Sequence, residues 1–225
     1  MDKQEPKTSG TSVIRSFALI YRIMMILLSW TALILQCYLM LINREVGLLE
    51  TMIRFFSFFT ILTNLLVALS FSLPLLTPGY RLSKFMARPQ TFTAIVVYII
   101  VVSAVYNMFL RNLWRPEGLQ FIVDLMLHTI LPALTILYWI VFIDKRGFRW
   151  AVVIPWLWYP LIYCLMILLI GSVSGFYPYP FVNVTTLGYP IVLLICVALA
   201  GVFLVLSLII VAITKLLNWK QENRH

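Results

Sequence analysis

The stretch Asp124–Pro132, DLMLHTILP, places a carboxylate and an imidazole inside a long apolar run of the chain. Burying such groups in a bilayer is costly, so they need partners or a function. On a helix, Asp124 and His128 stand four residues apart and share a face. Pro132 lacks the N–H that would normally bond the carbonyl oxygen of His128. One short segment therefore offers an acid, a base and an unpaired carbonyl.

Hydroxyl and amide side chains recur in the stretch RFFSFFTILTN, which begins at Arg54. With roughly 100° between successive helical residues, Ser57, Thr60 and Asn64 form a narrow stripe, and Thr63 lies beside it. Such side chains can bond back to their own helix or join two helices. The alternative interpretation is that the four of them line a cavity within the membrane.

Other polar residues fall in the same outer layer of the membrane. Asn107 and Arg111 share one helix face. His128 and Thr60 are expected at similar depths, roughly 10–13 Å below the outer ends of their spans. Gln36 belongs to this layer too, and a hydrogen bond between helices is its favoured interpretation. Polar groups in one leaflet indicate a one-sided pocket, whereas a transport path would continue to the other face.

The composition predicts an all-α, polytopic membrane protein. In 225 residues, 62% are hydrophobic and 11% are charged, whereas about a quarter of a soluble domain is charged. A transmembrane helix needs about 20 apolar residues. Six stretches are long enough: Phe17–Ile42, Ile53–Leu76, Phe92–Leu110, Leu119–Ile143, Trp150–Gly171 and Gly188–Thr214. We expect one six-helix membrane domain at 16–215, between a disordered cytoplasmic tail at 1–15 and a second tail at 216–225.

The formal charge of +9 is a topology signal and does not indicate nucleic-acid binding. With the N-terminus inside, twelve basic residues face the cytoplasm and four face outward, as the positive-inside rule requires. The outer four are Arg44, Arg54, Arg111 and Arg115. The inner ones are Lys3, Lys7, Arg15, Arg81, Lys84, Arg88, Lys145, Arg146, Arg149, Lys215, Lys220 and Arg224. Both termini are therefore expected in the cytoplasm, with the protein in the cell membrane among lipids. The sequence leaves the oligomeric state open.

Several catalytic and metal-binding motifs are absent from the sequence, among them GxSxG, a phosphate-binding glycine loop and HExxH. Asp124 and His128 have no evident third ligand, so neither a metal nor another cofactor is expected. The three cysteines form no CxxC pair, and we interpret them as small packing residues. They are Cys37, Cys164 and Cys196.

A nucleophile and a base remain as the available chemistry. A hydroxyl becomes nucleophilic when an imidazole takes its proton, and an acid or amide often orients that imidazole. The candidate nucleophiles are Thr60 and Ser57, and the candidate base is His128. Asp124 or Asn107 would orient the ring, although Asp124 lies on the same helix and could merely set its charge. The candidates for holding a carboxylate or an oxyanion are Arg111, Asn107 and Asn64.

The loop SVSGFYPYPFVNVTTLGYP has no Lys or Arg, and prolines at 178 and 180 exclude a regular helix. Tyr177, Tyr179 and Phe181 make it a stiff amphipathic segment that can lie on or dip into the outer interface. Two interpretations stay open, a lid over the pocket and an interfacial anchor.

Three motifs carry a resemblance to known proteins: FFTILTN at 58–64, LHTILP at 127–132, and YPYPF at 177–181. They resemble a bacterial six-pass membrane family of unknown function. That family is similar in turn to the eukaryotic androgen-induced protein and androgen-dependent TFPI-regulating protein. The resemblance runs from the second span into the sixth, and HTxxP and the YPF loop are its most specific parts.

The eukaryotic relatives are multipass hydrolases of fatty acid esters of hydroxy fatty acids, with an intramembrane threonine and histidine. The resemblance implies these roles for Thr60 and His128, with Thr63 as the alternative threonine. Asp124 stands where an amide is expected in the eukaryotic proteins. The segment LRNLWRPEG at 110–118 resembles only the bacterial group, so the ester can differ.

Three functional hypotheses follow. The first is an intramembrane hydrolase or acyl-transfer enzyme acting on a lipid ester in the outer leaflet. The second is a non-catalytic protein that binds lipid, or moves a small solute or protons, with Asp124 and His128 as a buried polar pair. In the third, the polar layer serves only helix packing.

Overall fold

A computed structural model describes residues 9–113 and 115–222 of the chain, and no strand occurs within these ranges. Six of its helical segments are long and apolar enough to cross a membrane, which confirms the predicted all-α membrane fold. These segments are Val13–Ile42, Phe59–Leu76, Pro89–Leu110, Gly118–Phe142, Trp150–Ser174 and Val184–Trp219. The connections between them are short.

The helices of the structure subdivide these spans. In chain order the α-helices are α1 (Ser9–Ile42), α2 (Leu48–Phe56), α3 (Phe59–Leu76), α4 (Arg81–Met86), α5 (Pro89–Val105), α6 (Gly118–Leu125), α7 (Leu131–Phe142), α8 (Val153–Trp156), α9 (Trp158–Ser174) and α10 (Val184–Glu222). Two π-helical turns, η1 (Tyr106–Leu110) and η2 (Met126–Ile130), extend α5 and join α6 to α7. Two 3-10 turns, η3 (Trp150–Val152) and η4 (Pro180–Val182), precede α8 and α10.

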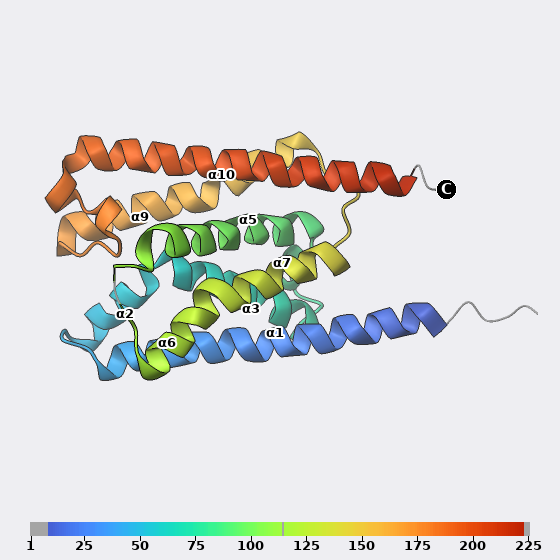
Figure 1. Cartoon of the computed structure of the whole chain (residues 1–225), viewed down its shortest axis with the longest axis horizontal. Helices are drawn as coiled ribbons and strands as arrows, with labels where there is room; N and C mark the ends of the chain where they lie inside the picture. Colours follow the sequence, from blue (N-terminus) through green and yellow to red (C-terminus); the bar gives the residue numbers. More distant parts are fainter. Residues whose placement is uncertain (1–8, 114, 223–225) are drawn as a thin grey trace, which may run out of the picture.

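Helix α5 occupies the centre of the bundle, in contact with α3, α7 and α10 (Figure 1). Its Val96, Val97 and Ile99 are fully buried. Helix α1 packs on α3 and α7, whereas α9 and α10 run side by side along the opposite face of the bundle. Tyr159 and Tyr163 of α9 contact Thr63 and Ser57, and a cavity lies between the α9–α10 pair and α5.

The described ends of α1 and α10 lie at the same end of the bundle (Figure 1), as six crossings require. Helix α1 begins at Ser9 and α10 continues to Glu222, so residues 9–15 and 216–222 are helical where sequence analysis expected tails. Residues 1–8 and 223–225 of those tails lie outside the described residues. The cytoplasmic position of the termini stays a prediction from the basic residues.

The second predicted span is divided between α2 and α3 by an extended residue, Phe58. The hydroxyl of Ser57 bonds back to the carbonyl of Ile53 at 2.7 Å, and the hydroxyl of Tyr163 donates to the Ser57 carbonyl at 2.8 Å. These two bonds satisfy carbonyl groups near the break, as a bilayer requires. The break makes Thr60 the second residue of α3, where its backbone N–H is not used by the helix.

The fourth span contains the π turn η2 directly before Pro132. A proline ring clashes with the carbonyl four residues earlier and cannot bond to it. In the wider turn, the N–H of Leu131 bonds to the carbonyl of Met126. The carbonyls of Leu127 and His128 therefore lack their usual α-helical partners. Such π turns are frequent at functional sites.

We predict that Tyr163→Phe lowers the stability of the fold. The substitution removes the only side-chain donor that the described residues provide to the Ser57 carbonyl, and an unsatisfied buried group costs about 1–3 kcal/mol. The measurement is thermal unfolding in detergent, with Tyr189→Phe, a change at an exposed tyrosine of α10, as control. Equal melting temperatures for both variants would contradict this account of the break.

Candidate functional site

Thr60 at the start of α3 faces His128 in η2. Its Oγ1 lies 3.3 Å from His128 Nε2, and Thr60 is 9% exposed. The prediction that the second and fourth spans bring a hydroxyl and an imidazole together is therefore confirmed. The helix break at Phe58 and the π turn η2 position the two side chains of this contact.

The other ring nitrogen of His128 faces Asp124. Nδ1 lies 3.0 Å from the carbonyl oxygen of Asp124 and 3.2 Å from its carboxylate Oδ1. Both atoms are acceptors, so they favour the tautomer with the proton on Nδ1. Nε2 is then the acceptor that faces Thr60. Asp124 thus contacts the ring through its carboxylate as well as its backbone.

Tyr106, the first residue of η1, completes this group and was not singled out in the sequence. Its hydroxyl donates to Asp124 Oδ2. Its ring stacks on the imidazole of His128, with centroids 3.7 Å apart and planes 11° from parallel. A phenol inside a membrane span needs a partner for its hydroxyl, which is the signal that would have drawn attention to it.

Asn64 and Asn107 donate hydrogen bonds to the carbonyls that have no helical donor in the π turn. Asn64 Nδ2 donates to the carbonyls of Thr60 at 2.9 Å and Leu127 at 3.2 Å. Asn107 Nδ2 reaches the His128 carbonyl at 3.4 Å and donates to Ser103 of its own helix. The expected spare carbonyl of His128 is thus present. The sequence suggested Asn64 and Asn107 as groups that could hold an oxyanion. Because their amide N–H groups bind carbonyls, these two side chains do not offer free donors for that role.

The other hydroxyls of the polar stripe have different partners. Ser57 bonds back to Ile53 within α2. Thr63 is fully buried and lies 3.0 Å from the hydroxyl of Tyr159 on α9. Thr60 is the one of the three that faces the imidazole.

Two further predicted residues lie at the edge of this group. Arg111 is exposed, and its Nη1 donates to Asn107 Oδ1 at 3.3 Å. Gln36 accepts a hydrogen bond from Gln120 on α6 at 3.0 Å, which confirms its interpretation as a contact between helices.

The aromatic loop between α9 and α10 reaches the site through Tyr179. The backbone N–H of Thr60 donates to the Tyr179 hydroxyl at 3.4 Å, and the ring of Tyr179 stacks on Phe181. Tyr177 packs instead against Gly171 of α9, so closely that a Cβ there would lie 2.0 Å from its ring. Burial raises the pKa of Tyr179, so its hydroxyl stays protonated at neutral pH.

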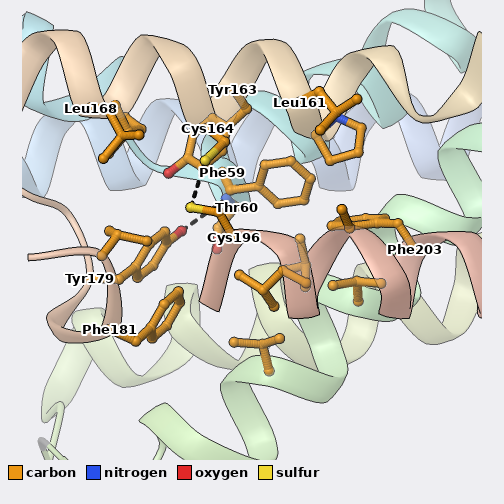
Figure 2. A pocket seen from close by; sticks show the side chains of 18 of the residues that line it. Phe59, Thr60, Leu161, Tyr163, Cys164, Leu168, Tyr179, Phe181, Cys196 and Phe203 are labelled. Carbon is orange, nitrogen blue, oxygen red and sulfur yellow. Dashed lines mark hydrogen bonds between the residues drawn. The ribbon is translucent and has the colours of Figure 1, made fainter. Parts of the chain in front are cut away.

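Two apolar cavities meet at Thr60. One, of about 480 Å³, lies between α5 and the α9–α10 pair (Figure 2). The other, of about 320 Å³, lies toward α1 and α6 and is lined by His128 and Asp124. Thr60, Tyr106, Leu110 and Tyr179 line both. Figure 2 shows Tyr179 and Phe181 reaching the larger cavity from the loop, with Tyr179 directed at Thr60.

Cys164 and Cys196 face each other across the α9–α10 wall of the larger cavity (Figure 2), and their sulfur atoms lie 2.7 Å apart. All three cysteines are free thiols, but the contact between this pair was not predicted. Cysteines on helices without a CxxC motif come together only by packing, which the sequence does not show. Cys37 on α1 has neither Cys164 nor Cys196 as a neighbour among the contacts of the described residues.

The described part of the chain contains no group of three His, Cys, Asp or Glu side chains arranged to hold a metal ion. Comparisons with protein-family models, with curated proteins and with solved structures found no match to this chain. The resemblance to the bacterial six-pass family and its eukaryotic relatives thus stays a prediction from the sequence motifs.

We predict that mild oxidation of the membrane-embedded protein with copper–phenanthroline and oxygen joins Cys164 to Cys196, because their sulfurs already touch. Mass spectrometry after alkylation and digestion should find the cross-linked peptide and one alkylated residue, Cys37. Cys164→Ser and Cys196→Ser should each abolish the cross-link, whereas Cys37→Ser should retain it. Full alkylation of all three cysteines after oxidation would contradict the packing of α9 on α10.

Proposed function

We propose that the protein is an intramembrane hydrolase or acyl-transfer enzyme acting on a lipid ester, with Thr60 as nucleophile and His128 as general base. The observation that carries the proposal is the 3.3 Å contact between Thr60 Oγ1 and His128 Nε2 at the junction of two apolar cavities. A hydroxyl beside an unprotonated imidazole nitrogen is the minimal nucleophile and base of acyl transfer.

In the first step, Oγ1 of Thr60 attacks the ester carbonyl carbon while His128 Nε2 takes its proton. The bond to the alcohol oxygen then breaks, and His128 returns the proton to the departing alcohol. Water attacks the acyl-threonine with His128 again taking a proton. The acyl–Oγ1 bond breaks, the fatty acid leaves and Thr60 recovers its proton. With an alcohol in place of water, the same steps give acyl transfer.

Asp124 and Tyr106 support the base in this proposal. The carboxylate and carbonyl of Asp124 hold the Nδ1 proton, so Nε2 faces Thr60 as an acceptor and the imidazolium is stabilised when it forms. Tyr106 fixes the carboxylate by a hydrogen bond and the ring by stacking.

The oxyanion of the tetrahedral intermediate would lie next to the nucleophile's own backbone N–H. That N–H is at the N-terminal end of α3, where the helix dipole favours negative charge. That N–H already donates to the Tyr179 hydroxyl at 3.4 Å. The oxyanion would therefore accept the proton of the Tyr179 hydroxyl, in the role that the sequence suggested for Asn64, Asn107 and Arg111.

The two cavities suggest an ester with two apolar arms. Thr60 belongs to both cavity walls, so an ester group beside it can extend its acyl chain into one cavity and its alcohol chain into the other. This agrees with the fatty-acid-ester substrates that the sequence resemblance implies. No cofactor is needed for these steps.

A second candidate function is a proton-coupled or ligand-binding role without catalysis. The 3.2 Å contact between Asp124 and His128 favours it, because intramembrane acid–base pairs are common in proton relays. In that case Thr60→Ala should preserve function, whereas Asp124→Asn should abolish pH-dependent flux into proteoliposomes.

We predict that a fluorophosphonate probe labels the purified protein in detergent at Thr60. Thr60→Ala and His128→Ala should both lose the label, since one removes the nucleophile and the other its base. Thr63→Ala is the matched control, because Thr63 contacts Tyr159 and not the imidazole. Labelling that persists in both Thr60→Ala and His128→Ala would remove the case for catalysis here. Labelling lost only in Thr63→Ala would exchange the two threonines.

We also predict that Asp124→Asn lowers kcat for a p-nitrophenyl fatty-acid ester about 100-fold or more, with KM nearly unchanged, because the imidazolium loses the negative charge that stabilises it while the backbone carbonyl of residue 124 still accepts the Nδ1 proton. Tyr106→Phe should lower kcat about tenfold, since it removes one charge-assisted hydrogen bond. The control is Asp144→Asn, at an exposed carboxylate paired with Arg146. An Asp124→Asn variant with wild-type kcat would show that Asp124 does not orient the base.

A further inference from the structure

A separate crevice of about 200 Å³ opens between η1 and α6. Arg111 and Arg115 line it together with Asn107, Asp124, Phe121 and Leu125. It shares Tyr106 and Asp124 with the cavity that contains His128, but neither Thr60 nor His128 lines it. Polar and apolar side chains both line the crevice, whereas the two cavities that meet at Thr60 are lined mainly by apolar side chains.

The charge in this crevice is positive. Neither Arg111 nor Arg115 forms an ion pair with any carboxylate among residues 9–113 and 115–222, although Arg54 at the same end of the bundle pairs with Glu50. Arg111 donates one hydrogen bond to Asn107, which leaves most of its five N–H groups for a ligand. Asp124, the one carboxylate in the crevice wall, is occupied by Tyr106 and His128.

The two arginines lie at the boundary of the membrane. Arg111 directly follows the span Pro89–Leu110, and Arg115 lies in the connection to the span that begins at Gly118. The phosphate groups of bilayer lipids lie at this depth, and basic pockets there bind lipid head groups. Phe121 in the crevice wall and Ile122, the next residue of α6, expose 48% and 52% of their surface. An acyl chain can pack along these side chains.

We propose that this crevice binds the phosphate group of an anionic membrane lipid, with the guanidinium groups of Arg111 and Arg115 on the phosphate oxygens. Two guanidinium groups suit a tetrahedral phosphate, which offers several oxygens, better than a carboxylate, which one arginine can satisfy. The lipid's acyl chains run along Phe121 and Ile122. The two arginines contact neither Thr60 Oγ1 nor His128 Nε2, so the lipid contact can be tested without changing the proposed nucleophile or base, although Tyr106 and Asp124 line both the crevice and the cavity with His128.

The test is native mass spectrometry of the purified protein titrated with dioleoyl phosphatidylglycerol or with dioleoyl phosphatidylcholine. The wild type should retain the anionic lipid preferentially. Arg111→Gln and Arg115→Gln should each weaken its binding about fivefold, since an arginine at the membrane surface contributes about that factor in affinity. Arg44→Gln, at an exposed arginine in the connection between α1 and α2 and outside the crevice, should bind the lipid like the wild type.

Three further arms make the outcome decisive. Thr60→Ala should bind phosphatidylglycerol like the wild type, so failure of the hydrolase proposal would leave this result untouched. Melting temperatures equal to that of the wild type would show that the arginine variants are folded. Inorganic phosphate that stabilises the protein while phosphatidylglycerol does not would identify free phosphate as the ligand and overturn the lipid assignment. Equal retention of both lipids, or an equal loss in Arg44→Gln, would overturn the site itself.

Discussion

Backbone carbonyls that lose their helical partner inside a membrane are the constraint on which the rest of this structure depends. Water cannot reach them in the bilayer core, so side chains must. Because of Pro132 and the π turn before it, the carbonyls of Leu127 and His128 lack helical hydrogen-bond donors. Asn64 and Asn107 donate to these carbonyls instead. The break after Ser57 is supported in the same way by Tyr163. Most of the polar layer therefore holds two irregular backbone segments in position.

Those two irregular segments are what bring Thr60 and His128 together. In a continuous second span, the backbone N–H of Thr60 would donate to a carbonyl of its own helix. Its hydroxyl would then lie on one face of a straight helix. The break instead makes Thr60 part of the first turn of α3, beside Tyr179. The π turn in turn aligns His128 with Tyr106 in η1 and with Asp124 one turn earlier. In both spans, the residue with the reactive side chain lies in or next to the irregular backbone segment.

The cavities around the Thr60–His128 contact depend on how whole helices and the aromatic loop pack together. Helices α9 and α10 contact α3 through Tyr159, Tyr163 and Phe203, and the larger cavity lies between this pair and α5. The aromatic loop closes its end by packing Tyr177 on Gly171 and directing Tyr179 at Thr60. The arginine-lined crevice lies outside these cavities, at the membrane surface, where charged side chains can stay hydrated. Apolar space is thus kept in the interior and cationic groups at the boundary.

The sequence by itself determined the six spans, because about 20 consecutive apolar residues leave few alternatives to a membrane helix. It also determined that Asp124 and His128 share a face and that the carbonyl of His128 lacks a helical donor, since both follow from spacing and from proline chemistry along one helix. Only the tertiary structure decided which of the three hydroxyls faces the imidazole. Ser57 bonds back to Ile53, Thr63 contacts Tyr159 on α9, and Thr60 contacts His128 in η2. Tyr106 and the Cys164–Cys196 pair were likewise visible only in the tertiary structure. A pattern of residues along one helix records which face is polar, but not how far a break or a π turn rotates that face toward its neighbours.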